Sequence, residues 1–137
     1  AAFVKTGYGI QVGSVDDLNA YNVVRVAGVL HTEAATANVP NVQAVTDPSQ
    51  MFKMVSAGRA DIAMSGYIDG LSKLRKFGMG DLEALEPPLR ELELFHYLHE
   101  ANADLVPVID AVVSEMAASG ELTELRLAKE EAYLATY

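Results

Sequence analysis

The segment from residue 23 to residue 30 (VVRVAGVL) constrains the fold of this chain more than any other part of the sequence. Apart from Arg25, it consists of aliphatic residues and glycine, and polar and apolar positions do not alternate along it. An uninterrupted apolar run of this length is typical of a strand that is covered on both faces, as in a parallel α/β sheet. The neighbouring sequence must therefore supply helices for both sides of this strand.

Strand-like and helix-like segments alternate through residues 1–88. The segments expected to form strands lie around Val4, Val26, Val42–Val45 and Ile62. The segments expected to form helices lie within residues 15–21, 31–41, 48–57 and 67–76. The clearest helix start is Asp47, whose side chain can cap the helix while Pro48 takes the first helical position. This order predicts an α/β fold with a small, mainly parallel sheet and helices on both faces.

Residues 89–137 form a second region with a different pattern. Pro87 and Pro88 exclude a central strand, so residues 85–88 are expected to be an extended connector. Residues 89–98 (LRELELFHYL) alternate well enough to predict a strand, and two amphipathic helices separated by Gly120 are expected to follow. The apolar face of the first helix consists of Leu105, Ile109, Val112, Val113 and Met116. Little sheet lies nearby in the sequence for these helices to cover.

The distribution of charge also changes near residue 80. The chain holds 19 acidic and 10 basic residues, a net charge of −9. Residues 1–80 hold six acids and seven bases, whereas residues 81–137 hold thirteen acids and three bases. An acidic balance of this kind argues against a nucleic acid as partner, and a block of acids most often forms a solvated helical surface.

No motif in the sequence predicts catalysis, a metal site or a cofactor. The chain has no cysteine, which excludes disulfides, thiolate metal ligands and a cysteine nucleophile. The glycines at positions 7, 9 and 13 do not have the spacing of a dinucleotide-binding loop. His96 and His99 would face opposite sides of the strand expected there, and no third metal ligand lies nearby in the sequence. We therefore assign no catalytic residue, no metal ligand and no cofactor.

The order of several segments is more informative than any single motif. These segments are residues 15–18 (VDDL) followed by 24–30 (VRVAGVL), 54–63 (MVSAGRADIA), 94–99 (LFHYLH) followed by 104–107 (DLVP), and 116–122 (MAASGEL). Together they resemble the second lobe and the C-terminal helices of bacterial extracellular solute-binding proteins of family 3, which are type II periplasmic binding proteins. The resemblance extends over nearly the whole chain.

This resemblance implies a clamshell of two lobes that holds a ligand between them, at strand ends and helix N-termini. Parallel α/β sheets bind ligands at such ends. In the family, the chain enters the second lobe near the position of residues 2–7 and returns to the first lobe near residues 86–92. We therefore expect residues 1–88 to be a lobe 2-like domain, and residues 89–137 to be a return strand and C-terminal helices that would pack on a missing first lobe. With that face uncovered, the chain is expected to self-associate through these helices.

The resemblance places the ligand-binding residues at Thr32, Ser65, Gly66 and Tyr67. Family members that bind amino acids usually hold the ligand's ammonium group with an aspartate at the position of Gly66, so this chain lacks the expected carboxylate. Thr32 fits a position where a hydroxyl often meets an anionic group, whereas the next residue, Glu33, would oppose an anion. We therefore do not expect an ordinary amino acid as the ligand.

The expected function is that of a periplasmic or extracellular solute-binding module, either a transport receptor or a sensor, for a small polar or anionic ligand. Its partners would be the membrane subunits of an ABC transporter or a sensor protein. An enzyme on the same scaffold is the alternative, because some family members resemble cyclic-acid dehydratases. A carboxylate paired with a hydroxyl in the cleft would favour the enzyme, and a cleft of small neutral residues favours binding.

Overall fold

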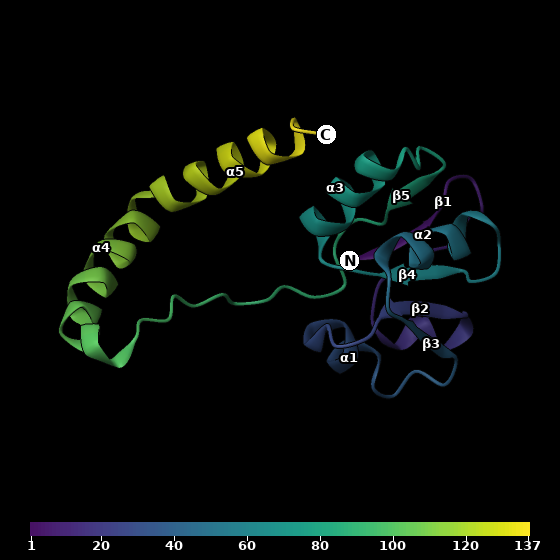
Figure 1. Ribbon diagram of the computed structural model, residues 1–137, viewed down its shortest axis with the longest axis horizontal. Helices are drawn as coiled ribbons and strands as arrows, with labels where there is room; N and C mark the ends of the chain where they lie inside the picture. The colour runs from purple at the N-terminus through teal and green to yellow at the C-terminus, as the bar shows by residue number, and fades with distance from the viewer. The chain divides into compact units, whose positions relative to one another are not determined.

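The computed structural model describes residues 1–137, which form two compact units (Figure 1). The first spans Ala1–Glu91 and the second spans Leu92–Thr136. The first unit contains the sheet and the residues expected to bind a ligand, whereas the second consists of helices and the segment that precedes them.

The first unit is built on a five-stranded sheet with the order β3-β2-β4-β1-β5 (Figure 1). The strands are β1 (Ala2–Lys5), β2 (Val23–Val26), β3 (Val42–Val45), β4 (Ile62–Met64) and β5 (Leu82–Ala84). β2 pairs in parallel with both β3 and β4, and β1 pairs antiparallel with both β4 and β5. β5 therefore runs in the same direction as β4, and β1 alone is reversed. The predicted α/β fold with a mainly parallel sheet is confirmed.

Helices cover both faces of this sheet, as the apolar runs require. The elements between the strands are η1 (Asp16–Ala20), α1 (Leu30–Thr36), α2 (Pro48–Ser56) and α3 (Tyr67–Phe77). Val24 and Ala63 pack with residues of α2 and α3 on one face. Their neighbours Val23 and Ile62 pack on the other face with Leu18 of η1 and with residues of α1. Because adjacent side chains of the central strands β2 and β4 enter different cores, Arg25 is the one polar residue of these two strands.

The apolar run at residues 23–30 is strand for only half its length. β2 ends at Val26, the chain turns at Gly28 with a φ of 79°, and α1 begins at Leu30. A positive φ is costly for any residue with a Cβ, so glycine is what allows the turn here. The helix expected within residues 31–41 is α1, and the cap of α2 is confirmed because the Asp47 side chain accepts a hydrogen bond from the N–H of Ser49.

Phe3 of β1 joins the sheet to α2 and α3. Its ring is fully buried and meets the ring of Phe52 edge-on, with centroids 5.5 Å apart. A Cβ added to Gly70, in the middle of α3, would lie 2.1 Å from Cζ of Phe3. The aromatic ring therefore occupies the space that a side chain at position 70 would need, and α3 lies directly against the sheet.

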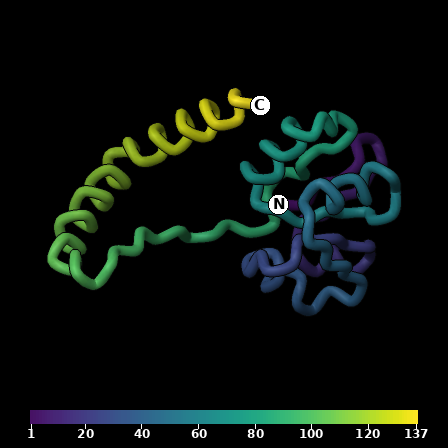
Figure 2. Tube along the Cα trace, viewed as in Figure 1, coloured from purple at the N-terminus to yellow at the C-terminus, as the bar shows by residue number.

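The second unit has helices but no buried core. It contains η2 (Glu100–Leu105), α4 (Val106–Ser119) and α5 (Glu121–Leu134), which follow one another along the trace in Figure 2. Gly120, with a φ of 87°, separates α4 from α5 at the predicted place. No residue of Leu92–Thr136 is buried, and only a few, including Ile109, Val113 and Met116, are partly covered.

The prediction of a return strand at residues 89–98 is wrong for this structure. These residues have no regular secondary structure, and all of them after Leu89 are exposed. The alternation of apolar and acidic residues is suited to one face of a sheet, but a strand forms only where a neighbouring strand pairs with it. No strand of this chain does so.

We predict that Gly70→Ala destabilises the first unit by about 2 kcal/mol. Overpacking against a rigid buried ring costs about 1–3 kcal/mol, and the better helix propensity of alanine returns at most about 1 kcal/mol. The 2.1 Å approach to Phe3 places the cost at the upper end of that range. Urea denaturation measures the difference, with Gly80→Ala as the control because a Cβ there meets no atom within 4 Å. A Gly70→Ala variant as stable as wild type would contradict this account of the core.

Candidate functional site

The starts of α1 and α3 lie at the same edge of the sheet. β2 and β4 are parallel neighbours that end at Val26 and Met64, and each is followed within a few residues by a helix. An ideal Cβ on Gly66, which precedes α3, would lie 3.9 Å from Nε2 of His31 in the first turn of α1. We call the residues at these two helix starts, Leu30, His31, Gly66, Tyr67 and Ile68, the helix-start site.

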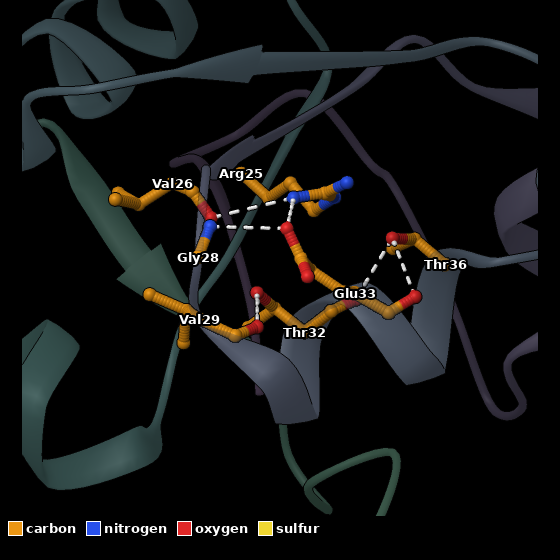
Figure 3. Close-up of polar contacts among 7 residues, drawn as sticks. All are labelled: Arg25, Val26, Gly28, Val29, Thr32, Glu33 and Thr36. Carbon is orange, nitrogen blue, oxygen red and sulfur yellow. Dashed lines mark hydrogen bonds and ion pairs between the residues drawn. The ribbon is translucent and has the colours of Figure 1, made fainter.

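Glu33 fixes the turn that leads into α1 (Figure 3). Its Oε1 accepts one hydrogen bond from Nη1 of Arg25 at 2.7 Å and another from the N–H of Gly28 at 3.0 Å. The Gly28 N–H and then the Arg25 guanidinium hold the pKa of Glu33 below its ordinary value. Arg25 therefore offsets the charge of Glu33, which weakens the repulsion of an anion that the sequence suggests.

Thr32 lies behind the helix-start site. Its side chain is buried, and its hydroxyl donates to the carbonyl of Val29 at 2.9 Å, within the same turn (Figure 3). The donors that the first turn of α1 leaves unused are the main-chain N–H groups of Leu30 and His31, which have no acceptor in the chain. Thr32 therefore supports the turn, and the hydrogen-bonding capacity comes from the backbone beside it.

The residues at the start of α3 are held by side-chain hydrogen bonds. Ser65 is buried, and its hydroxyl donates to Oδ2 of Asp69 at 3.3 Å. Asp69 also forms an ion pair with Lys73 one turn later. The Tyr67 hydroxyl donates to Oε1 of Glu86, and this hydrogen bond raises the pKa of Tyr67 above its ordinary value.

The structure thus brings Ser65, Gly66 and Tyr67 to one sheet edge with the first turn of α1. It also adds two residues that the sequence analysis did not name, His31 and Asp69. Both residues lie in the first turn of their helix. The helix starts after Val29 and Gly66 are the sequence signal that could have placed them at the site. The N–H groups of Tyr67 and Ile68, like those of Leu30 and His31, precede the first carbonyl that an α-helix can pair.

A separate cavity of about 680 Å³ lies along α2 and the edge strand β3. Its lining includes Gln43, Gln50, Lys53 and Arg59, and none of its residues belongs to the helix-start site. No group of three or more histidine, cysteine or acidic side chains could hold a metal ion. None of the helices combines the length and the apolar character that crossing a membrane requires.

Comparisons with known proteins identify the fold. No family model and no curated protein matches the sequence. Domain 2 of TmArgBP is similar, with a TM-score of 0.52 and 18% identity over 60% of this chain and 88% of that one. A histidine kinase sensor domain with similarity to periplasmic binding proteins has a TM-score of 0.56 and 18% identity over 100% of this chain and 57% of that one. The substrate-binding protein of an amino acid ABC transporter has a TM-score of 0.55 and 23% identity over 90% of this chain and 55% of that one.

These likenesses show that the chain has the α/β fold of one lobe of a type II periplasmic binding protein. The chain spans a little more than half the length of the sensor domain and of the transporter's binding protein. It spans most of the single-domain structure.

We predict that Glu33→Gln lowers the melting temperature at pH 7 and that this difference disappears in acid. The pKa of Glu33 is lower in the folded chain than in the unfolded one, where a value of about 4.3 is expected. The carboxylate therefore stabilises the fold above that value, and the contribution is lost as the pH falls through the folded-state pKa. Melting curves of both proteins between about pH 7 and pH 3 measure the gap. Glu83→Gln, at an exposed glutamate without a hydrogen-bond partner, is the control. A gap that stays constant down to pH 3 would contradict the assigned role of Glu33.

Proposed function

We propose that this chain is a ligand-binding module: one lobe of an extracytoplasmic solute-binding or sensor protein that holds a small polar or anionic ligand at the helix-start site. The observation that carries the proposal is the parallel pairing of β2 with β4, because it places the starts of α1 and α3 at one edge of the sheet. Parallel α/β sheets bind ligands at this edge, and free N–H groups in the first turn of a helix favour anions.

The acids in the two helix starts are offset by cations, which leaves room for an anionic group on the ligand. Each of the two helix starts contains an acid, and both acids have a cationic partner. Glu33 is paired with Arg25, and Asp69 is paired with Lys73. The main-chain N–H groups of His31, Tyr67 and Ile68 remain as unused donors.

The same site has little to offer an ammonium group. Gly66 carries no carboxylate, and the charge of Asp69, the acid beside it, is offset by the ion pair with Lys73. Ordinary α-amino acids should therefore bind weakly here, although solved structures of this fold include amino acid-binding proteins.

A second lobe facing the helix-start site would complete the clamshell and exclude water from the ligand. Binding pockets for small molecules bury most of the ligand's surface. The open edge of a single lobe cannot do so. In this proposal the whole receptor lies in the periplasm or outside the cell and delivers its ligand to ABC transporter membrane subunits or to a sensor protein. The similar structures described above are binding proteins and a sensor domain, which supports a binding role rather than an enzymatic one.

We predict that inorganic phosphate and acetate bind the isolated chain at the helix-start site with dissociation constants in the millimolar range. Amide chemical shifts of His31, Tyr67 and Ile68 should move together in NMR titrations, because their N–H groups face the anion. Ile68→Pro should weaken the effect, since proline removes one donor but is compatible with the first turn of a helix. Ile68→Ala keeps that donor and is the matched control. Shifts confined to other residues, or submicromolar binding of glycine or arginine, would contradict the proposal.

We also propose that the second unit covers its apolar side chains by association with a second copy of the chain. Several large apolar side chains of this unit are between about two-fifths and three-fifths exposed, namely Leu105 (44%), Val106 (48%), Val108 (59%), Val112 (52%), Leu125 (45%) and Leu127 (52%). Burying a side chain of this size contributes about 1.5–3 kcal/mol, so a covered arrangement is strongly favoured.

Sedimentation velocity tests this association. We predict a dimer or larger species at tens of micromolar, and a shift towards monomer in a Val112→Lys variant. Ser114→Lys, which adds the same charge at an exposed polar position of α4, should leave the association unchanged. A monomer throughout this concentration range would contradict self-association.

A further inference from the structure

We propose that β3, a free edge of the sheet, pairs with residues 91–95 (ELELF) of a second copy of this chain, and that Lys53 and Arg59 beside β3 meet the acids of that segment. This inference rests on the self-association proposed above and adds to it the two surfaces that meet. It does not depend on the helix-start site or on a ligand.

β3 presents unpaired main-chain groups at one edge of the sheet (Figure 1). It pairs with β2 alone, and on that side the carbonyl of Val45 accepts from the N–H of Ala27. Main-chain groups of successive residues in a strand point to opposite edges, so the N–H and C=O groups of Val42 and Ala44 point away from the sheet. An exposed edge of this kind can take up a further strand from another chain.

The surface beside this edge carries two cations that have no partner. The cavity of about 680 Å³ along α2 and β3 includes Lys53 and Arg59 in its lining. Both side chains are exposed, and neither forms a hydrogen bond or an ion pair. The one acid of the lining, Asp47, already accepts hydrogen bonds from the N–H and the hydroxyl of Ser49. A strand added to β3 is therefore favoured when it carries acids on the face towards α2.

Residues 91–95 have the properties that such a strand needs. They are exposed, have no regular secondary structure within one copy, and alternate acidic with apolar residues. In an extended conformation Glu91 and Glu93 lie on one face, and Leu92 and Leu94 lie on the other. The two carboxylates form no hydrogen bond or ion pair in the chain, and both leucines are more than half exposed. Pairing with β3 would give this segment a neighbouring strand and its acids cationic neighbours.

Charge also distinguishes β3 from the other edge of the sheet. The strand at that edge, β5, carries Glu83 and directly follows Asp81. Like charges on neighbouring strands disfavour pairing and opposite charges stabilise it, so an acidic strand is favoured at β3 and not at β5. Because every copy has both the free edge and the acidic segment, two copies related by a two-fold axis can each supply the strand that the other lacks.

Two substitutions at Ala44 test the main-chain pairing. Ala44→Pro removes the N–H that points away from the sheet, and proline is tolerated at such a position of an edge strand. We expect it to weaken the dimer about tenfold in sedimentation velocity, because an intermolecular hydrogen bond is lost. Ala44→Val keeps the N–H and should change the dissociation constant by less than about threefold. Because Ala44 is exposed, monomers of both variants should melt within a few degrees of wild type.

An exchange of charges tests the complementarity independently. Lys53→Glu/Arg59→Glu and Glu91→Lys/Glu93→Lys should each weaken self-association about tenfold, and an equimolar mixture of the two variants should restore it. The second variant makes the net charge of −9 less negative, so general repulsion between copies would instead make it associate more tightly. Lys76→Glu, at an exposed cation of α3 outside the cavity lining, should leave the association unchanged.

Sedimentation velocity combined with amide hydrogen exchange gives a distinct outcome for each claim. The inference predicts that the amides of Val42 and Ala44 are protected in the dimer and exchange freely in the dilute monomer. If the wild type is a monomer at tens of micromolar, self-association and this inference fail together. If Val112→Lys disrupts the complex but the variants at β3 and at residues 91–95 do not, the inference is overturned while self-association stands. Protection of Val42 and Ala44 in a monomer would also overturn it, because the added strand would then belong to the same copy.

Discussion

The contact between Phe3 and Gly70 holds the first unit together. β1 is the one reversed strand, and it lies between β4 and β5, where Phe3 packs against α2 and lies close to α3. Phe3 is fully buried against Phe52 of α2, and its ring occupies the space that a side chain at Gly70 of α3 would need. Protein interiors are close-packed, so the buried Phe3 ring limits how closely α3 can approach the sheet. A larger residue at position 70 would therefore have to displace α3 or the Phe3 ring, and Gly66 lies at the start of this helix.

The two units differ in how far their apolar side chains are buried. The first unit buries two clusters of side chains, one on each face of its sheet. The second unit buries none, although α4 and α5 contain many aliphatic residues. Helices of 14 residues draw most of their stability from packing of an apolar face rather than from intrinsic propensity. α4 and α5 therefore lack within this chain the packing that stabilises the sheet.

The sequence predicted correctly those helices and strands that depend on neighbouring residues in the chain. The Asp47 cap, the glycine after α4 and the strands β2, β3 and β4 follow from residue type and spacing. β5 was missed because its three residues are strand only through pairing with β1, far away in the sequence. Residues 89–98 were predicted as a strand for the opposite reason: the alternation is present, but no strand pairs with it.

The grouping of some candidate residues at one sheet edge was predicted, but their contacts were not, for similar physical reasons. The sheet edge followed from the order of strands and helices, which brings Ser65, Gly66 and Tyr67 to the start of α3. The inward direction of the Thr32 hydroxyl depends on the turn at Gly28, and the proximity of His31 to Gly66 depends on how two helices pack. Neither follows from residue spacing. The ion pair between Arg25 and Glu33 also joins a strand to a helix, and it offsets the charge that the residue type alone suggests.

Hydrogen exchange of the dilute chain tests most directly the claim that the core belongs to Ala1–Glu91 and that the second unit has none of its own. The account predicts that amides of β1, β2 and β4 exchange together and slowly, with the free energy of global unfolding. Amides of α4 and α5 should exchange on the order of a hundredfold faster or more, because few packed side chains oppose their opening. Equal protection of α4, α5 and the sheet, at a concentration where the chain is a monomer, would contradict it.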